Sequence, residues 1–256
     1  MSGEILAIVT ELNPKHIIDC TFGAGGHASL LLNAGYQVTS FDQDPTALFH
    51  AQKLNSYSKF RFISDQFSNI DKYNLGADLI LADLGMSTMQ IRNQNGFSFM
   101  QNSRLEMKMS GKPPFLYEIL SSMPKYKIMD ILQQYGEEPK ARQIATNIDN
   151  YRLHSKIETT FDLRDATGVS NFSTLARVFQ AFRIYINEEM KELDTLIQFI
   201  FHDKINALIL SFHSLEDRRV KECAKQAPYS KLYLPSQAEI DINPASRSAK
   251  LRYISW

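Results

Sequence analysis

Three aspartates each follow a short segment rich in apolar and β-branched residues, and their side chains could line a ligand pocket. They are Asp19, Asp42 and Asp83. In an open α/β sheet the ligand lies outside the carboxyl ends of the parallel strands. We therefore expect the three acids to surround one pocket, although a single aspartate at such a position is more often a turn or helix-cap residue.

A glycine-dense turn follows Asp19 and has the sequence Cys20-Thr21-Phe22-Gly23-Ala24-Gly25-Gly26-His27. The next residues, Ala28–Leu32, have the pattern of a helix, so the predicted order is strand, glycine loop and helix. Glycines allow the backbone to approach a ligand closely, and a helix N-terminus supplies free N–H groups. A tight turn that binds nothing is the alternative interpretation of the loop alone.

The positions of the acids indicate which nucleotide the loop would bind. Asp42 lies about twenty residues beyond the loop, where an acid accepts hydrogen bonds from the ribose of a dinucleotide or of an adenosyl cofactor. An acid such as Asp19 beside the loop would repel a pyrophosphate. S-adenosylmethionine carries a sulfonium and an ammonium group and no phosphate, so the acids favour this cofactor.

The exit of the fourth predicted strand is the candidate for chemistry on a substrate. Asp83, with the backbone and hydroxyl groups of Gly85–Thr88, could accept hydrogen bonds from an exocyclic amine, and Ser87 supplies one of these hydroxyls. Such an amine is a poor nucleophile, so its orientation against a methyl donor would supply much of the catalysis. The amine would lose its proton during or after transfer. A second turn at the edge of the cofactor is the alternative interpretation of Asp83.

Strands that alternate with helices would position these residues. We predict an α/β fold, a Rossmann-like sheet of parallel strands covered by helices on both faces. The alternating segment Lys250–Ile254 is predicted to add a terminal antiparallel strand. The predicted parallel strands are Lys15–Asp19, Tyr36–Phe41, Phe60–Ile63, Ala77–Ala82 and Ala207–Phe212.

A helical segment at residues 104–174 interrupts the strand pattern, and we interpret it as an insertion domain. Amphipathic pieces such as Lys127–Leu132 support this interpretation. The sheet domain would then comprise residues 1–103 and 175–256, with one helical run, Leu175–His202, returning the chain to the sheet. We expect the insertion to form a lid or one wall of a substrate groove.

Composition restricts the class of protein and of partner. The 256 residues include 28 Lys and Arg and 28 Asp and Glu, so a nucleic acid must be bound by a local patch. No apolar run reaches the roughly 18 residues of a membrane span, and no secretory signal is visible. Cys20 and Cys223 form no metal or redox motif, so we predict reduced packing cysteines, no metal site and an intracellular protein.

Seven stretches of the sequence form an ordered set of motifs that spans nearly the whole chain. They are residues 19–27, 41–45, 83–90, 96–99, 179–188, 211–218 and 243–252. The run Ser-Phe-His-Ser-Leu-Glu-Asp-Arg at Ser211–Arg218 is highly specific. In these stretches the chain resembles the ribosomal RNA (cytosine-N4)-methyltransferases of the small subunit, the RsmH or MraW family, which has an animal mitochondrial relative.

The resemblance implies an S-adenosylmethionine-dependent methyltransferase sheet with a helical insertion, which methylates the N4 atom of a cytidine in small-subunit ribosomal RNA. It also implies cofactor contacts in the glycine loop, at the ribose, and beyond the third and fourth strands. From the sequence pattern alone, Phe67 would be a core residue. Carried over residue by residue, the implied cofactor contacts are Gly25, Gly26, His27, Asp42, Phe67, Asp83 and Gln90.

The chain departs from the family pattern chiefly within the insertion, which is shorter than usual. Where the family has Leu-Asp-Met-Arg-Met-Asp, this chain has Leu105–Ser110, in which Glu106 and Lys108 keep the charge sign. Lysine does not reproduce the bidentate fork of arginine. These changes leave the predicted cofactor site intact and concern the RNA side, where the substrate or the level of activity would be altered.

Basic residues late in the chain are candidates for binding RNA phosphates. Arg183 and Arg218 follow motif residues, so structural ion pairs are the alternative for these two. The set comprises Arg177, Arg183, Arg218, Arg219, Lys221, Arg247, Lys250 and Arg252.

His213 and Ser211 stand at the exit of the fifth predicted strand. We hypothesise that they shape a cytosine pocket, which a base enters after unstacking. The predicted catalytic residues are therefore Asp83, Ser87 and His213. A hydrogen-bonded structural role is the alternative for His213.

Two rival functions stay open. A cofactor-binding but catalytically weak ribosome-assembly or RNA-binding factor is compatible with the altered segment Leu105–Ser110. An NAD-linked oxidoreductase is disfavoured by the acid beside the glycine loop. The predicted partners are small-subunit ribosomal RNA or the assembled small subunit, without a membrane and with a homodimer as one option. The expected location is the bacterial cytoplasm or the mitochondrial matrix.

Overall fold

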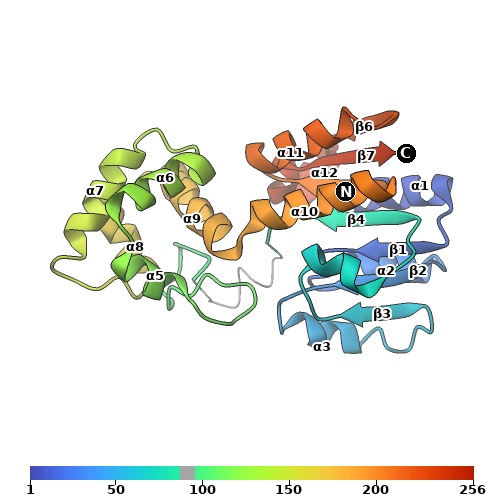
Figure 1. Cartoon of the computed structure of the whole chain (residues 1–256), viewed down its shortest axis with the longest axis horizontal. Helices are drawn as coiled ribbons and strands as arrows, with labels where there is room; N and C mark the ends of the chain where they lie inside the picture. Colours follow the sequence, from blue (N-terminus) through green and yellow to red (C-terminus); the bar gives the residue numbers. More distant parts are fainter. Residues whose placement is uncertain (87–95) are drawn as a thin grey trace. The chain divides into compact units, whose positions relative to one another are not determined.

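The computed structural model describes residues 1–86 and 96–256. The chain forms two compact units (Figure 1): a sheet unit of residues 1–85 and 190–256, and a helical unit of residues 86–189. The predicted site residues Ser87 and Gln90 lie outside the described residues. Within the described part of the chain, no helix is long and apolar enough to cross a membrane.

Seven strands form a single sheet in the order β3-β2-β1-β4-β5-β7-β6. The first five run parallel, and β7 is antiparallel to both of its neighbours, β5 and β6. This arrangement confirms the predicted α/β sheet and its terminal antiparallel strand. The prediction missed β6, because its residues are mostly exposed and no buried apolar run marks it. The strands are β1 His16–Asp19, β2 Gln37–Phe41, β3 Phe60–Ile63, β4 Leu79–Asp83, β5 Asn206–Ser211, β6 Tyr229–Tyr233 and β7 Lys250–Ser255.

Helices cover both faces of the sheet, as the sequence predicted. They are α1 Ser2–Leu12, α2 Gly26–Asn33, α3 Ala47–Gln52, the 3₁₀ helix η1 Phe67–Tyr73, α10 Glu189–Asp203, α11 Ser214–Ala224, α12 Gln237–Ile242 and the 3₁₀ helix η2 Pro244–Ser248. On β4, Leu79 and Leu81 pack with α1, α2 and α3, whereas Ile80 and Ala82 pack with η1, α10 and α11. Successive strand residues point to opposite faces, so each face has its own core.

The helical unit has a separate hydrophobic core. Its helices are α5 Leu116–Ser122, α6 Lys125–Gly136, α7 Ala141–Tyr151, α8 Thr160–Thr167 and α9 Phe172–Asn187. Helices α6 and α9 pack closely, since a Cβ added at Gly136 would lie 2.9 Å from the carbonyl oxygen of Arg177. Because of this packing α9 belongs to the helical unit. The unit, residues 86–189, therefore includes more of the sequence than the predicted insertion at residues 104–174.

The helical run predicted at Leu175–His202 is two helices rather than one. Helix α9 ends at Asn187, Glu188 adopts a left-handed φ of 53°, and α10 begins at Glu189. No glycine or proline marks this break, so the apolar periodicity gave no sign of it.

Candidate functional site

The loop between β1 and α2 is fixed by backbone hydrogen bonds to the neighbouring strands. The N–H of Cys20 donates to the carbonyl of Leu81 on β4, and the N–H of Phe22 donates to the carbonyl of Phe41 on β2. Gly25, the N-cap of α2, has a φ of 80°, and a Cβ added there would lie 2.8 Å from the ring of Phe22. Glycine is therefore required at this position by both backbone conformation and packing.

Asp42 lies at the exit of β2 and supports the glycine loop. Its Oδ2 accepts a hydrogen bond from the N–H of Gly23 at 2.7 Å, and its Oδ1 accepts one from the N–H of Asp44 at 2.8 Å. Burial raises the pKa of Asp42 to about 6, although these N–H groups lower it in part. A carboxylate can accept about four hydrogen bonds, so Asp42 keeps capacity for ribose hydroxyls.

Asp19 is buried at the end of β1, where it is 1% exposed. Its Oδ1 accepts a hydrogen bond from the N–H of Thr21, and its Oδ2 accepts one from the hydroxyl of Ser40, both at 3.2 Å. Burial raises the pKa of Asp19 to about 6, while the charge of His27 and these hydrogen bonds lower it. A buried acid with only partial compensation is suited to a site that binds a cation.

Asp83 and His27 form a polar pair between the end of β4 and the first turn of α2. The N–H of Asp83 donates to Oγ1 of Thr21 at 2.6 Å, and Nε2 of His27 lies 3.3 Å from Oδ2 of Asp83. Among the described residues, Nδ1 of His27 and Oδ1 of Asp83 are buried and have no hydrogen-bond partner. Such atoms normally find a partner, so this pair has hydrogen-bonding capacity left for a ligand.

The charges around His27 determine its protonation. Burial lowers the pKa of His27, but the hydrogen bond that His27 donates to Asp83 and the charges of Asp83 and Asp19 outweigh burial, so the net pKa is raised. The carboxyl ends of β1 and β4 and the start of α2 thus bring three predicted residues into one electrostatic cluster. Asp42 is connected to the same loop through Gly23.

Of the remaining predicted cofactor contacts, Gly26 and Phe67 lie on the same unit. Gly26 begins α2, and nothing lies within 4 Å of a Cβ added there. Phe67 begins η1 and is half-buried against the core on the η1 face of the sheet. Beside it, the side-chain amide of Gln66 donates to that of Gln43 at 3.2 Å. Phe67 therefore has a packing role and retains exposed ring surface.

Sequence reasoning missed the polar residues that hold the acids. Ser40 binds Asp19, and Thr21 binds Asp83. Ser40 is fully buried on β2, and its position one residue before the predicted strand end is the only signal that the sequence offered. Thr21 gave a weaker signal, because a threonine in a glycine loop is also typical of a turn.

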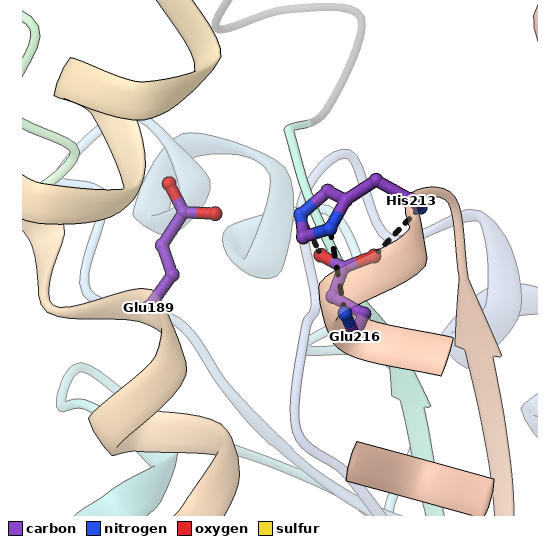
Figure 2. Close-up of side chains that lie close together, drawn as sticks. All are labelled: Glu189, His213 and Glu216. Atoms are coloured by element: carbon purple, nitrogen blue, oxygen red, sulfur yellow. Dashed lines mark hydrogen bonds and ion pairs between the residues drawn. The ribbon is translucent and has the colours of Figure 1, made fainter. Parts of the chain in front are cut away.

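His213 is the N-cap of α11 (Figure 2). Its Nδ1 accepts a hydrogen bond from the N–H of Glu216 at 3.4 Å, while the Glu216 carboxylate accepts from the N–H of Phe212 at 2.8 Å. The buried residue Ser211 has its hydroxyl 3.5 Å from the carbonyl of Lys250. The bond to Nδ1, together with the one that the N–H of His213 donates to the Glu216 carboxylate at 3.4 Å, forms a capping box. These contacts give His213 the structural role named as the alternative, and its catalytic role stays a prediction.

Two of the predicted RNA-binding arginines form ion pairs inside the helical unit. Arg177 binds the buried carboxylate of Glu138 at 2.7 Å. Arg183 binds Glu189, labelled in Figure 2, through two hydrogen bonds of 2.8 and 2.9 Å. The structural alternative proposed for Arg183 is therefore confirmed.

The sheet unit also uses two of its predicted RNA-binding residues in ion pairs. Asp217 binds Lys250 at 2.6 Å and Arg252 at 2.7 Å, and these partners lower its pKa against the effect of burial. Lys221 and Arg247 are exposed. Because Lys250 and Arg252 are paired with Asp217, Lys221 and Arg247 are the stronger candidates for binding phosphate on this unit.

The segment Leu105–Ser110, where the chain departs from the family pattern, is part of the scaffold of the helical unit. Met107 is buried, and the ammonium group of Lys108 donates to the carbonyl of Ile186 at 2.6 Å. Asn187 accepts a hydrogen bond from the N–H of Met109 and donates to the carbonyl of Met107, both at 2.8 Å. Lys108 and the backbone of Met107 and Met109 therefore anchor this segment to the end of α9.

Comparison with known proteins gives consistent matches over the chain. The model of the MraW methylase family matches residues 1–233. The ribosomal RNA small subunit methyltransferase H of Ehrlichia canis (strain Jake) is 36% identical over an alignment of 287 positions. The alignment covers 98% of this chain and 96% of the relative. The proteins of the same name from Rickettsia canadensis (strain McKiel) and Sulfurihydrogenibium azorense (strain DSM 15241 / OCM 825 / Az-Fu1) are each 34% identical. The matches cover 98% and 97% of this chain, and 95% of each relative.

Proposed function

The chain belongs to the MraW methylase family, and on this premise we propose that it transfers a methyl group from S-adenosylmethionine to the N4 atom of a cytidine in small-subunit ribosomal RNA. The observation that carries the proposal is the match of 98% of the chain to relatives named ribosomal RNA small subunit methyltransferase H. The acids at the ends of β1, β2 and β4 agree with the cofactor of a methyltransferase.

The residues of the site fit an adenosyl cofactor that carries positive charge. Asp19 and Asp83 supply carboxylates beside the glycine loop, and Asp42 keeps acceptor capacity for ribose hydroxyls. We propose cofactor contacts at Gly25, Gly26, His27, Asp42, Phe67, Asp83 and Gln90. S-adenosylmethionine would supply a methyl group bound to a positively charged sulfur. When the methyl group moves to a nucleophile, the sulfur keeps the electron pair of the broken sulfur–methyl bond.

Asp83 would orient the substrate amine. The lone pair of the cytosine amine is delocalised into the ring, so the amine reacts only when its lone pair is aimed at the methyl carbon. An ionised carboxylate accepts a hydrogen bond from the amine and then its proton, as the new nitrogen–carbon bond forms. Ser87 and His213 remain further candidates for shaping the base pocket.

The helical unit is our candidate for substrate recognition. We assign this role to residues 86–189, and we expect RNA or the assembled small subunit as the partner. The altered segment Leu105–Ser110 does not favour a catalytically weak factor, because Lys108 has a partner of its own within the unit.

The proposal is tested by deleting the gene and measuring N4-methylcytidine in small-subunit ribosomal RNA by mass spectrometry. We expect loss of this nucleotide and its return when the gene is supplied again. Calorimetric titration with S-adenosylmethionine and with NAD should show binding of the first only. Unchanged N4-methylcytidine after deletion would contradict the substrate, and absence of adenosyl cofactor binding would contradict the reaction class.

A further inference from the structure

We propose that His27 is a positioning residue for methyl transfer, because its Nε2–H holds Oδ2 of Asp83 and leaves Oδ1 as the oxygen that receives the substrate amine. This inference rests on the proposed function and goes beyond it, since it gives His27 a role that acts through Asp83 rather than only through the cofactor. It also assigns the two carboxylate oxygens of Asp83 to different partners.

The backbone of both residues is well fixed. Asp83 ends β4 and its N–H is bound by Oγ1 of Thr21 at 2.6 Å. His27 is the second residue of α2, and the helix begins at the glycine loop whose geometry Phe22 and Gly25 determine. The hydrogen bond of 3.3 Å between Nε2 and Oδ2 thus connects two rigid elements, α2 and β4. A carboxylate held at one oxygen loses rotational freedom at the other, which is what orientation of an amine requires.

The unpartnered atoms show which oxygen remains for the substrate. Oδ1 of Asp83 is buried and has no hydrogen-bond partner among the described residues. A buried acceptor without a donor destabilises the protein, so a ligand N–H that binds this atom is more stabilising than one that binds an oxygen with a donor already in place. Oδ2 is bound by His27, so Oδ1 is the better acceptor for the amine.

The charged groups around His27 keep it a donor. Asp83 on β4 and Asp19 on β1 favour the protonated ring, while burial and the N-terminal amine ahead of α1 oppose it. Nε2 carries a hydrogen both in the imidazolium and in the neutral tautomer that binds Asp83. The contact therefore persists on both sides of the titration of His27.

The proton balance of the step is simple. The nitrogen–methyl bond forms as the sulfur–methyl bond breaks, and the electron pair of the broken bond stays on sulfur. The nitrogen loses one proton, which Oδ1 of Asp83 accepts and then releases to solvent. His27 stays hydrogen-bonded to Oδ2 throughout and neither gains nor loses a proton.

The pair itself is tested on the cofactor-free full-length chain by NMR of ¹⁵N-labelled histidines. We expect the pKa of His27 to lie above its ordinary value of 6.5 and to fall in the Asp83→Asn variant, because the carboxylate that raises it is removed. His202 is a matched control, since it pairs with Asp203 at 2.6 Å on the surface and its side chain is 88% exposed. An unchanged pKa of His27 in Asp83→Asn would overturn the pair.

The positioning role is tested by comparing two amides at residue 27. Glutamine places its amide nitrogen near the position of Nε2, whereas asparagine places it near Nδ1. We expect His27→Asn to lower kcat by about 10- to 100-fold, the usual effect of losing an orienting partner, and His27→Gln to restore kcat to within about 3-fold. The KM for RNA should change little, and His202→Gln should leave activity unchanged. Equal loss in both amide variants would overturn the role, provided that circular dichroism shows both to be folded.

The two proposals fail in different ways. If the unmodified chain does not methylate RNA but Asp83→Asn still lowers the pKa of His27, the proposed function is wrong and the pair stands without its role in transfer. If the unmodified chain methylates RNA while both amide variants lose activity equally, the proposed function stands and the positioning role is wrong.

Discussion

The sheet unit and the helical unit differ in how completely their buried polar side chains are hydrogen-bonded. In the helical unit Glu138 is bound by Arg177, and the side chain of Asn187 makes three hydrogen bonds to backbone groups. No buried side-chain nitrogen or oxygen in the described residues of this unit lacks a partner. At the strand ends of the sheet unit, His27 and Asp83 each retain a buried atom without a partner.

This difference separates scaffold from site. Complete pairing makes the buried polar groups of the helical unit stabilising and inert. Incomplete pairing at the start of α2 and at the end of β4 destabilises the free protein but leaves atoms that a ligand can bind. Substitutions should therefore affect activity in the sheet unit and stability in the helical unit, and the following predictions test this separation.

The largest expected effect is on activity, from Asp83→Asn. The amide cannot accept the amine proton, so methyl transfer to small-subunit RNA should fall by about 10²- to 10⁴-fold with little change in thermal stability. A radiolabelled methyl-transfer assay measures this, with Asp203→Asn on the surface as control. Full activity in Asp83→Asn would remove this residue from the mechanism.

The next effect is on stability, from Asn187→Ala in the helical unit. This buried side chain binds the carbonyls of Met107 and Arg183 and the N–H of Met109. Its removal leaves backbone groups unpaired, and we expect a loss of about 2–4 kcal/mol in the free energy of unfolding. Urea denaturation measures the loss. The affinity for S-adenosylmethionine of the folded protein should be unchanged, and a large drop in that affinity would contradict the separation of scaffold from site.

Gly25→Ala tests the geometry of the loop against a matched glycine. Gly25 has a φ of 80° and a close contact to Phe22, whereas Gly35 has a φ of 91° and nothing within 4 Å of an added Cβ. Gly35→Ala should therefore lower stability by only the backbone strain of about 1–2 kcal/mol. Gly25→Ala should lose about 1 kcal/mol more and should also weaken cofactor binding. Equal losses of stability would mean that the contact with Phe22 is unimportant.

The smallest effect is a gain of stability in Asp19→Asn. In the native state the pKa of Asp19 is about 6, so the proton is kept up to that pH, whereas the unfolded chain releases it near the ordinary pKa of 3.8. Stability therefore falls as the pH rises through this window. At pH 8 the variant should be more stable by about 1–3 kcal/mol, and the difference should vanish below about pH 4.

Denaturation of both proteins across pH measures the gain in Asp19→Asn, and calorimetry should show weaker binding of S-adenosylmethionine in the variant. A variant that is less stable at pH 8 would show that the ionised carboxylate stabilises the fold.

Much of the sheet could be predicted because its central strands are buried on both faces. The predicted strand Ala207–Phe212 matches β5, Asn206–Ser211, to within one residue at each end, and every residue of β5 after Asn206 is buried. The edge strand β6 escaped because its side chains are mostly exposed. The break after α9 escaped because Glu188, not a glycine, adopts the left-handed conformation. Both misses occur where the residue type indicates neither the exposure of the side chain nor the backbone conformation.

The candidate site could be predicted as a set of residues but not as a set of contacts. The position of Asp83 after an apolar run identified it as a strand-end acid. The contact of Asp83 with His27 depends on how α2 leaves the loop, which no sequence spacing encodes. Likewise, the sequence showed Lys108 as a departure from the family, and only its bond to the carbonyl of Ile186 shows what it does.

The pairing of β4 with β5 has a consequence for how the protein is made. Asp83 pairs with Leu210, and the whole helical unit lies between them in the sequence. During synthesis β1 to β4 emerge first, and one side of β4 stays unpaired until the helices α5 to α10 and then β5 have left the ribosome. Contacts between residues so distant in sequence form slowly, and an open strand edge favours aggregation. Early folding of the contiguous helical unit would shorten the effective distance between β4 and β5 and so limit this exposure.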